Sequence, residues 1–107
     1  MKQLYQKNDA LLNPSFCIPP SDTVYNVVMT PNVAQTVAIP VGAKYVIFST
    51  TANIWVNYNA TSAIPTVSIV SGTQSELNPN GRYINGYSTI SIIADTAAKL
   101  SLAFYSE

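Results

Sequence analysis

The chain has 107 residues, of which 48% are hydrophobic and 9% are charged, and its five basic and five acidic residues cancel. A chain of this length forms one domain and can bury a core without disulfides or metals. The few, balanced charges exclude the clustered Lys and Arg that nucleic acid or an anionic membrane would require. Burying hydroxyls and amides costs less than burying ions, so this uncharged polar surface favours a subunit of an assembly. An ordinary neutral β-domain is the alternative.

Residue usage also argues against catalytic and metal-binding chemistry. Cys17 is the only cysteine and histidine is missing, so the sequence predicts neither an internal disulfide nor a cysteine-based metal site. General acid–base catalysis needs a histidine or a tuned carboxylate pair. We therefore expect no enzyme and no cofactor, because the acids are scattered: Asp9, Asp22, Glu76, Asp95 and Glu107. The sequence predicts no signal peptide and no membrane-spanning run, which favours assembly in a cytoplasm.

Residues 1–21 differ in pattern from the rest of the chain. Pro14, Pro19 and Pro20 prevent a continuous helix and favour extended backbone. We expect an extended N-terminal arm, with one short helical turn at most, that packs along a neighbouring subunit. A frayed terminus is the alternative. The apolar anchors of the arm would be Leu11, Leu12, Phe16 and Ile18.

After the arm, apolar residues recur with a period of two, which indicates β-strands. Residues 22–107 therefore predict an all-β domain, a single β-sandwich or jelly-roll-like fold of about seven or eight antiparallel strands. In the last strand, Leu100, Leu102 and Phe104 would face the core and Tyr105 the opposite side. The expected strands are residues 23–29, 33–39, 44–50, 54–59, 66–70, 87–94 and 98–105.

The most hydrophobic stretch, residues 39–58, reads as a β-hairpin with a polar turn at residues 49–53. The consecutive apolar residues 45–48 predict a first strand that is covered on both faces. The second strand is one-sided and would direct Trp55 outward.

Residues 76–82 contain the strongest turn signal, Asn78-Pro79-Asn80-Gly81. If residues 77–81 form the loop, Glu76 and Arg82 stand opposite each other and can form an ion pair. Such a pair would fix the loop; alternatively, Arg82 would reach a partner subunit.

The aromatic residues are candidates for core packing or for a contact surface. Trp, Tyr and Arg are enriched at protein interfaces, and exposed rings also stack on sugars. We expect Trp55 at an interface, because it shares a polar strand face with Asn57 and Asn59. The candidate contact residues of the domain are Trp55, Tyr58, Arg82, Tyr83 and Tyr87.

Several motifs resemble small virion proteins of tailed bacteriophages. They are Ile39-Pro40-x-Gly42-Ala43-x-Tyr45-Val46, Phe48-Ser49, Trp55-Val56, Glu76-Leu77-Asn78-Pro79-x-x-Arg82, Thr89-Ile90-Ser91-Ile92-Ile93-Ala94 and Leu102-x-Phe104-Tyr105. The resemblance spans about residues 36–105 and leaves out the arm. Through these motifs the chain is similar to capsid decoration or cement proteins. The resemblance carries over no active site.

This resemblance implies a virion protein that binds the major capsid protein or another virion protein, as a homo-oligomer such as a dimer or trimer. Three functions remain open. The first is a decoration or cement protein that stabilises the capsid lattice from outside. The second is a neck, tail or head-fibre component. The third is a carbohydrate- or receptor-binding β-module that uses Trp55 and the tyrosines.

Overall fold

The structure, a computed structural model, describes residues 1–4 and 18–106, while residues 5–17 and 107 lie outside this description. The described residues form eight strands and no helix, which confirms the predicted all-β class. The strands are β1 (Thr23–Met29), β2 (Gln35–Ala38), β3 (Tyr45–Thr50), β4 (Trp55–Asn57), β5 (Glu76–Leu77), β6 (Gly81–Tyr83), β7 (Thr89–Ile93) and β8 (Ala98–Tyr105).

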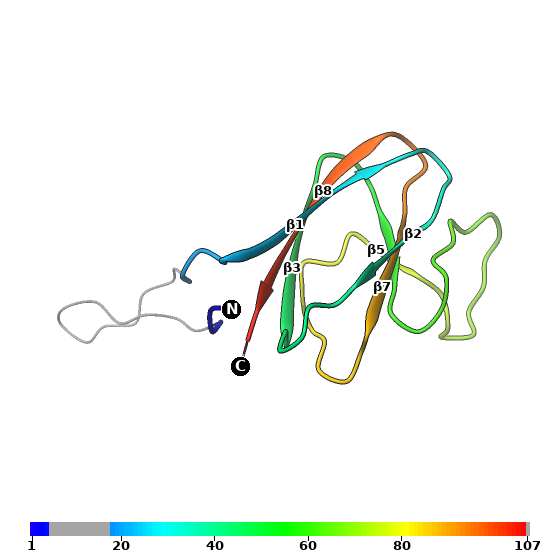
Figure 1. Cartoon of the computed structure of the whole chain (residues 1–107). Coiled ribbons are helices and arrows are strands. Elements are labelled where there is room, and N and C mark those ends of the chain that lie inside the picture. Colours follow the sequence, from blue (N-terminus) through cyan, green and yellow to red (C-terminus); the bar gives the residue numbers. More distant parts are fainter. Residues whose placement is uncertain (5–17, 107) are drawn as a thin grey trace.

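The strands form two four-stranded antiparallel sheets, in the orders β1-β8-β3-β6 and β2-β7-β4-β5 (Figure 1). The pairing is nested: β1 pairs with β8, β2 with β7, β3 with β6, and β4 with β5. The additional pairs β3 with β8 and β4 with β7 complete each sheet. A double sheet of eight antiparallel strands with this nested order is consistent with the predicted sandwich or jelly-roll-like arrangement.

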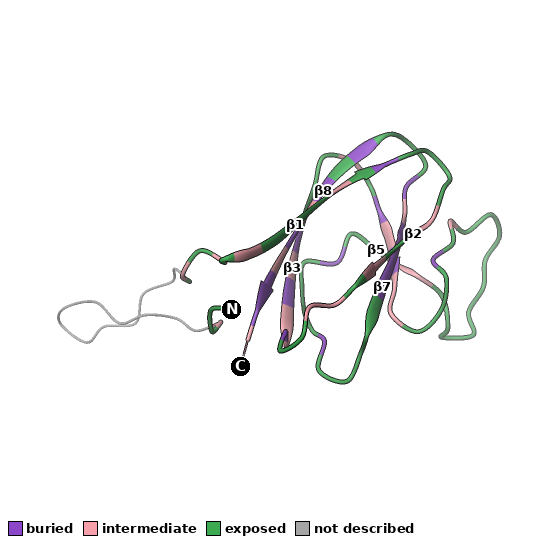
Figure 2. Ribbon diagram, in the orientation of Figure 1, coloured by how far each residue is buried: buried purple, intermediate pink, exposed green. Residues whose placement is uncertain are grey.

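Both sheets contribute to one hydrophobic core, and buried residues lie in β3 and β8 of one sheet and in β7 of the other (Figure 2). In β8, Leu100, Leu102 and Phe104 are all buried, as the alternation predicts. Ile90 and Ile92 of β7 come from the other sheet and have no exposed surface. The core therefore lies between the sheets, where period-two patterns place their apolar side chains.

The predicted hairpin of residues 39–58 is wrong, because β3 and β4 belong to different sheets. The chain crosses between them at Ile54, whose side chain is fully buried. The Ile54 N–H donates to Asn78 Oδ1 at 2.9 Å, and the Asn78 N–H donates to the Ile54 carbonyl at 2.9 Å. Two apolar strands joined by a polar turn fit either a hairpin or such a crossing. Here Val46 and Val56 are both buried in the one core that the two sheets share.

The strand expected over residues 66–70 is also wrong. Residues 58–75 connect β4 to β5 without a strand, and Val67 and Ile69 are exposed. Their alternation imitates a strand, yet these residues pair with no strand of either sheet. The short strands β5 and β6, which flank the predicted turn, are too short to show a period in the sequence.

Tyr105, expected on the outer face of β8, is buried instead. The chain before β1 covers it, and the Tyr105 hydroxyl donates to the Pro19 carbonyl at 2.8 Å. Beside it, the Ser21 hydroxyl donates to the Phe104 carbonyl at 2.7 Å. The sequence pattern of β8 alone cannot reveal a cover that comes from a segment so distant in sequence.

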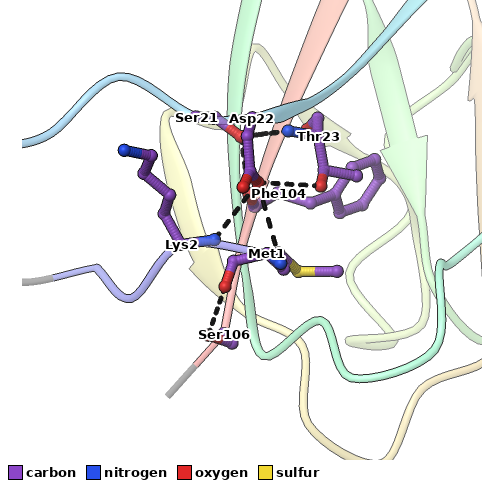
Figure 3. A network of polar contacts seen from close by, with 7 residues as sticks. All are labelled: Met1, Lys2, Ser21, Asp22, Thr23, Phe104 and Ser106. Atoms are coloured by element: carbon purple, nitrogen blue, oxygen red, sulfur yellow. Dashed lines mark hydrogen bonds and ion pairs between the residues drawn. The ribbon is translucent and has the colours of Figure 1, made fainter.

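The first residues of the chain also contact the domain (Figure 3). The Leu4 N–H donates to the Ser106 carbonyl, and the Ser106 N–H donates to the Lys2 carbonyl at 2.7 Å. Asp22 Oδ1 accepts the Lys2 N–H at 3.2 Å and the Thr23 hydroxyl at 3.1 Å, and it lies 3.8 Å from the N-terminal ammonium. Desolvation acts to raise the pKa of Asp22, but these donors and the ammonium outweigh it and lower that pKa. Both described ends of the predicted arm are thus attached to the domain.

Candidate functional site

An open cleft of about 580 Å³ lies where the edge strands β5 and β6 of the two sheets meet. Its volume falls within the roughly 300–1,000 Å³ of small-molecule sites. Strand β4, the loop at residues 58–75 and the turn after β6 complete its walls. We call it the tyrosine cleft, and it is lined by Val56, Asn57, Tyr58, Asn59, Ala60, Gly72, Thr73, Gln74, Glu76, Arg82, Tyr83, Ile84 and Tyr87.

Strand register explains why charged side chains face this cleft. Glu76 is opposite Val56, and Arg82 is opposite Val46. Directly paired residues share a face of the sheet, and both valines are buried in the core. Glu76 and Arg82 therefore point into the space between the sheets, at the edge where this space opens to solvent.

The ion pair predicted between Glu76 and Arg82 is confirmed, and it has bidentate geometry. Arg82 Nε donates to Glu76 Oε1 at 3.0 Å, and Nη2 donates to Oε2 at 3.1 Å. The Tyr58 hydroxyl also donates to Oε1 at 3.0 Å, and Arg82 Nη1 donates to the Gly81 carbonyl at 2.7 Å. Because β5 and β6 lie in different sheets, this network joins the two sheets at the mouth of the core.

The network changes the titration of two members. Burial and the neighbouring Glu76 carboxylate raise the pKa of the Tyr58 hydroxyl far above its ordinary value of 10.0. The hydrogen bond to Glu76 raises the pKa of Arg82 as well. At neutral pH Tyr58 is therefore an uncharged donor and Arg82 a cation that Glu76 balances.

Four of the predicted contact residues converge on the cleft: Tyr58, Arg82, Tyr83 and Tyr87. The rings of Tyr58 and Tyr87 lie 5.8 Å apart at 54°. Tyr83 packs against Tyr45 with ring centroids 5.1 Å apart. Tyr83 and Tyr87 are 51% and 43% exposed, so their rings form part of the molecular surface.

The other predicted contact residues lie elsewhere. Trp55 is half-buried on β4, outside the tyrosine cleft, and next to Val56 it faces the opposite side of the sheet. Ile18 is exposed on the segment before β1. Leu11, Leu12 and Phe16 lie outside the described residues.

Sequence reasoning missed the contribution of the loop at residues 58–75. Its start is fixed to β7, because the Ser62 N–H donates to Ser91 Oγ at 2.8 Å and the two hydroxyls lie 3.0 Å apart. The Ala63 N–H donates to the Ser75 hydroxyl at 3.1 Å and holds the two ends of the loop together. The loop thereby supplies Gly72, Thr73 and Gln74 as one wall of the cleft. The only signal in the sequence is a run of hydroxyl and amide residues around a glycine.

A second candidate surface is β1, an outer strand of its sheet. Its seven residues, TVYNVVM, contain no charge and no proline. Val24 and Val28 are 47% and 69% exposed. The Gln35 side chain donates to the Val28 carbonyl at 2.8 Å and covers one point of this edge.

Metal-binding clusters and membrane-spanning helices are not found in the described residues. Among residues 1–4 and 18–106, no group of three or more His, Cys, Asp or Glu side chains could hold a metal ion. No helix in this part of the chain is long and apolar enough to cross a membrane. Comparison with known protein families, with curated proteins and with solved structures returned no match.

Proposed function

We propose that this chain is a non-enzymatic structural subunit of a tailed-bacteriophage virion. It binds the outside of the capsid lattice as a decoration or cement protein and stabilises the lattice. Its partner is the major capsid protein, and its copies associate as dimers or trimers after synthesis in the host cytoplasm. The observation that carries the proposal is the uncharged, exposed edge strand β1.

An outer strand presents a row of backbone N–H and C=O groups that another chain can pair with. Proteins that function alone protect such edges with charges, prolines, bulges or very short strands. Strand β1 has seven uncharged residues, and its exposed valines add apolar area beside the backbone groups. These properties support a contact with another protein along β1.

The residues that resemble phage virion proteins lie in the framework of the fold. They occupy the turn before β3, the start of β4, the turn between β5 and β6, and the strands β7 and β8. This distribution supports a shared fold. It agrees with a role in which the fold is a scaffold for assembly.

A protein that binds the assembled lattice stabilises it by linkage, because each bound copy lowers the free energy of the assembled state relative to the disassembled one. Many copies on a symmetric shell multiply a modest contact. A surface with few ions suits this task, since little desolvation penalty opposes the contact.

The proposal is tested by charging β1. We expect the double variant Val24→Lys/Val28→Lys to lose co-sedimentation with capsids that lack this protein, and to stop raising the temperature at which those capsids disassemble. The matched control is Val67→Lys/Val70→Lys, which places the same charges on exposed valines of the loop at residues 58–75. Undiminished occupancy by a folded Val24→Lys/Val28→Lys variant would overturn the role of β1.

The predicted arm is tested in the same assay. Replacing Leu11, Leu12 and Phe16 by serine removes its apolar anchors while keeping the described attachments of residues 1–4 and 18–21. We expect reduced occupancy of capsids by a domain that remains folded. Occupancy equal to that of the unmodified chain would exclude these residues as anchors.

Copy number separates this proposal from a neck, tail or head-fibre role. A decoration protein is present in numbers comparable with the major capsid protein, whereas neck, tail and fibre components are present in few copies. Quantitative mass spectrometry of purified virions measures this ratio. A low ratio would favour the neck, tail or head-fibre role.

A further inference from the structure

The tyrosine cleft presents aromatic faces to solvent in a place where the proposed assembly does not need them. Tyr83 and Tyr87 are about half exposed, and the Tyr87 ring packs against the Tyr58 ring. Aromatic rings offer a flat apolar face with a negative quadrupole, which attracts the polarised C–H groups of a sugar ring. The tyrosine hydroxyls add polar groups beside that face.

The polar groups around these rings are already held in place. Asn57 Oδ1 accepts the N–H groups of Asn59 and Ala60 at 2.9 and 3.0 Å, which orients the Asn57 side chain. Within the described part of the chain, no hydrogen bond engages the Asn57 Nδ2 group. The Tyr58 hydroxyl donates a hydrogen bond to Glu76, so its oxygen can still accept one from a ligand. Groups fixed before binding lose little conformational entropy when a ligand arrives.

The charges of the cleft indicate the class of ligand. Glu76 and Arg82 are the only ionised side chains among its lining residues, and they neutralise each other through two hydrogen bonds. An anionic ligand would have to compete with Glu76 for Arg82, and a cation would have to compete with Arg82 for Glu76. A neutral ligand with many hydroxyls avoids both conflicts.

We infer that the tyrosine cleft binds a neutral saccharide. One sugar ring stacks on the Tyr87 ring, and the hydroxyls of the sugar form hydrogen bonds with Asn57, Tyr58 and Gln74. Trp55 takes no part, because it lies outside the cleft. The site is also independent of the proposed assembly surface, since β1 and β6 are the two outer strands of one sheet.

The test is a titration of the free, isotopically labelled protein with methyl glycosides of glucose, galactose and N-acetylglucosamine, followed by NMR. Methyl glucuronide, N-acetylneuraminic acid and a proline-rich peptide are the comparison ligands. We expect at least one neutral glycoside to shift amide signals of the cleft residues. The acidic sugars and the peptide are expected to bind more weakly.

Variants connect the binding to the stacked ring. We expect Tyr87→Ala to lower the affinity for the tightest-binding neutral glycoside by about tenfold, because one good stacking contact is lost. Tyr87→Phe keeps the ring and is expected to retain binding. Gln74→Ala, which changes only an exposed loop side chain, is expected to weaken binding even if Tyr87→Ala fails to fold. Val70→Ser is the control in the same loop, at a side chain that is 97% exposed and does not line the cleft.

Several results would overturn the inference. They are the absence of a shift with every neutral glycoside, shifts that map outside the cleft, tighter binding of the acidic sugars or the peptide, and equal affinity of Gln74→Ala and the unmodified chain. The outcome is separate from that of the assembly proposal, because this titration contains no capsid. Val24→Lys/Val28→Lys is expected to bind sugar normally, and Gln74→Ala is expected to occupy capsids normally.

Discussion

Replacing Tyr58 by phenylalanine removes a single oxygen from the network that joins the two sheets. The lost interaction is the hydrogen bond from the Tyr58 hydroxyl to Glu76 Oε1, 3.0 Å long. Hydrogen bonds to charged groups contribute about 1.5–3 kcal/mol, and the exposure of this carboxylate reduces the figure to about 1 kcal/mol. Arg82 still satisfies both Glu76 oxygens in the variant, so no buried charge is left alone. We expect the free energy of unfolding to fall by about 1 kcal/mol, which lowers the melting temperature by about 4 °C in a domain of this size.

The same substitution removes a dependence of stability on pH. Burial and Glu76 raise the pKa of Tyr58 in the folded protein above its ordinary value of 10.0. The stability contributed by the neutral hydroxyl is therefore complete below pH 10 and is lost as the pH rises toward the higher folded pKa. Tyr58→Phe should lose less stability than the unmodified chain between pH 9 and pH 11, so the difference between the two proteins narrows in that window.

Guanidinium denaturation followed by the fluorescence of Trp55, at pH 7 and at pH 11, measures both effects. Tyr83→Phe is the matched control, because in the described part of the chain the Tyr83 hydroxyl makes no hydrogen bond. Equal stability of Tyr58→Phe and the unmodified chain at both pH values would refute the reasoning. So would an equal loss in Tyr83→Phe, since the effect would then come from any tyrosine hydroxyl.

Three further substitutions test other parts of the structure. Asp22→Asn should lower the melting temperature at neutral pH. Because the pKa of folded Asp22 is lowered, the difference should begin to shrink below pH 3.8, the ordinary carboxyl pKa, and vanish below the lower folded pKa; a difference that persists there would contradict this. Gly42→Ala should lower the free energy of unfolding in urea by about 1–3 kcal/mol, because φ is +90° at this position. Gly81→Ala should be nearly neutral, because φ is ordinary there and the nearest atoms lie 3.9 Å from an added Cβ. Similar losses of stability in the two variants would disprove the strain argument. Ser91→Ala leaves the buried Ser62 N–H without its acceptor and should lower the free energy of unfolding by about 1–3 kcal/mol. Faster amide hydrogen exchange of the Ser62 N–H would show that the loop is loosened, and unchanged exchange would contradict this prediction.

The faces of the strands could be predicted from the sequence because burial imposes a period of two. Leu100, Leu102 and Phe104 alternate with more polar residues, and all three lie in the core. The partners of each strand could not be predicted in this way. A strand that crosses to the other sheet buries the same face as a strand that turns back in a hairpin, so residues 39–58 fit both arrangements. The deciding contact comes from Asn78, far along the chain.

The site was predictable where a short-range turn creates it. Glu76 and Arg82 flank a strong turn signal and form the predicted ion pair. The turn, however, covers residues 78–80 and not 77–81, and it joins strands of different sheets. The loop wall was not predictable, because the buried contact between Ser62 and Ser91 joins residues in different elements. Ser62 follows polar residues, and Ser91 falls on the face of β7 opposite Ile90 and Ile92, so the sequence marks neither serine as buried. Tyr105 is hidden for the same reason, since the cover comes from Pro19.

The order of the strands separates the two proposed activities in space. In the sheet β1-β8-β3-β6, a chain that docks on β1 is two intervening strands away from β6, which carries Arg82. Adjacent strands lie about 4.8 Å apart, so the two edges are separated by roughly 14 Å of sheet. A subunit attached to a lattice through β1 alone would therefore carry its tyrosine cleft at the opposite edge of that sheet. If both proposals hold, particles that carry this protein should bind the same neutral saccharide as the free chain, with avidity from the many copies on one shell. Sugar binding by the free chain that disappears on the particle would place the lattice contact at the cleft edge and not at β1.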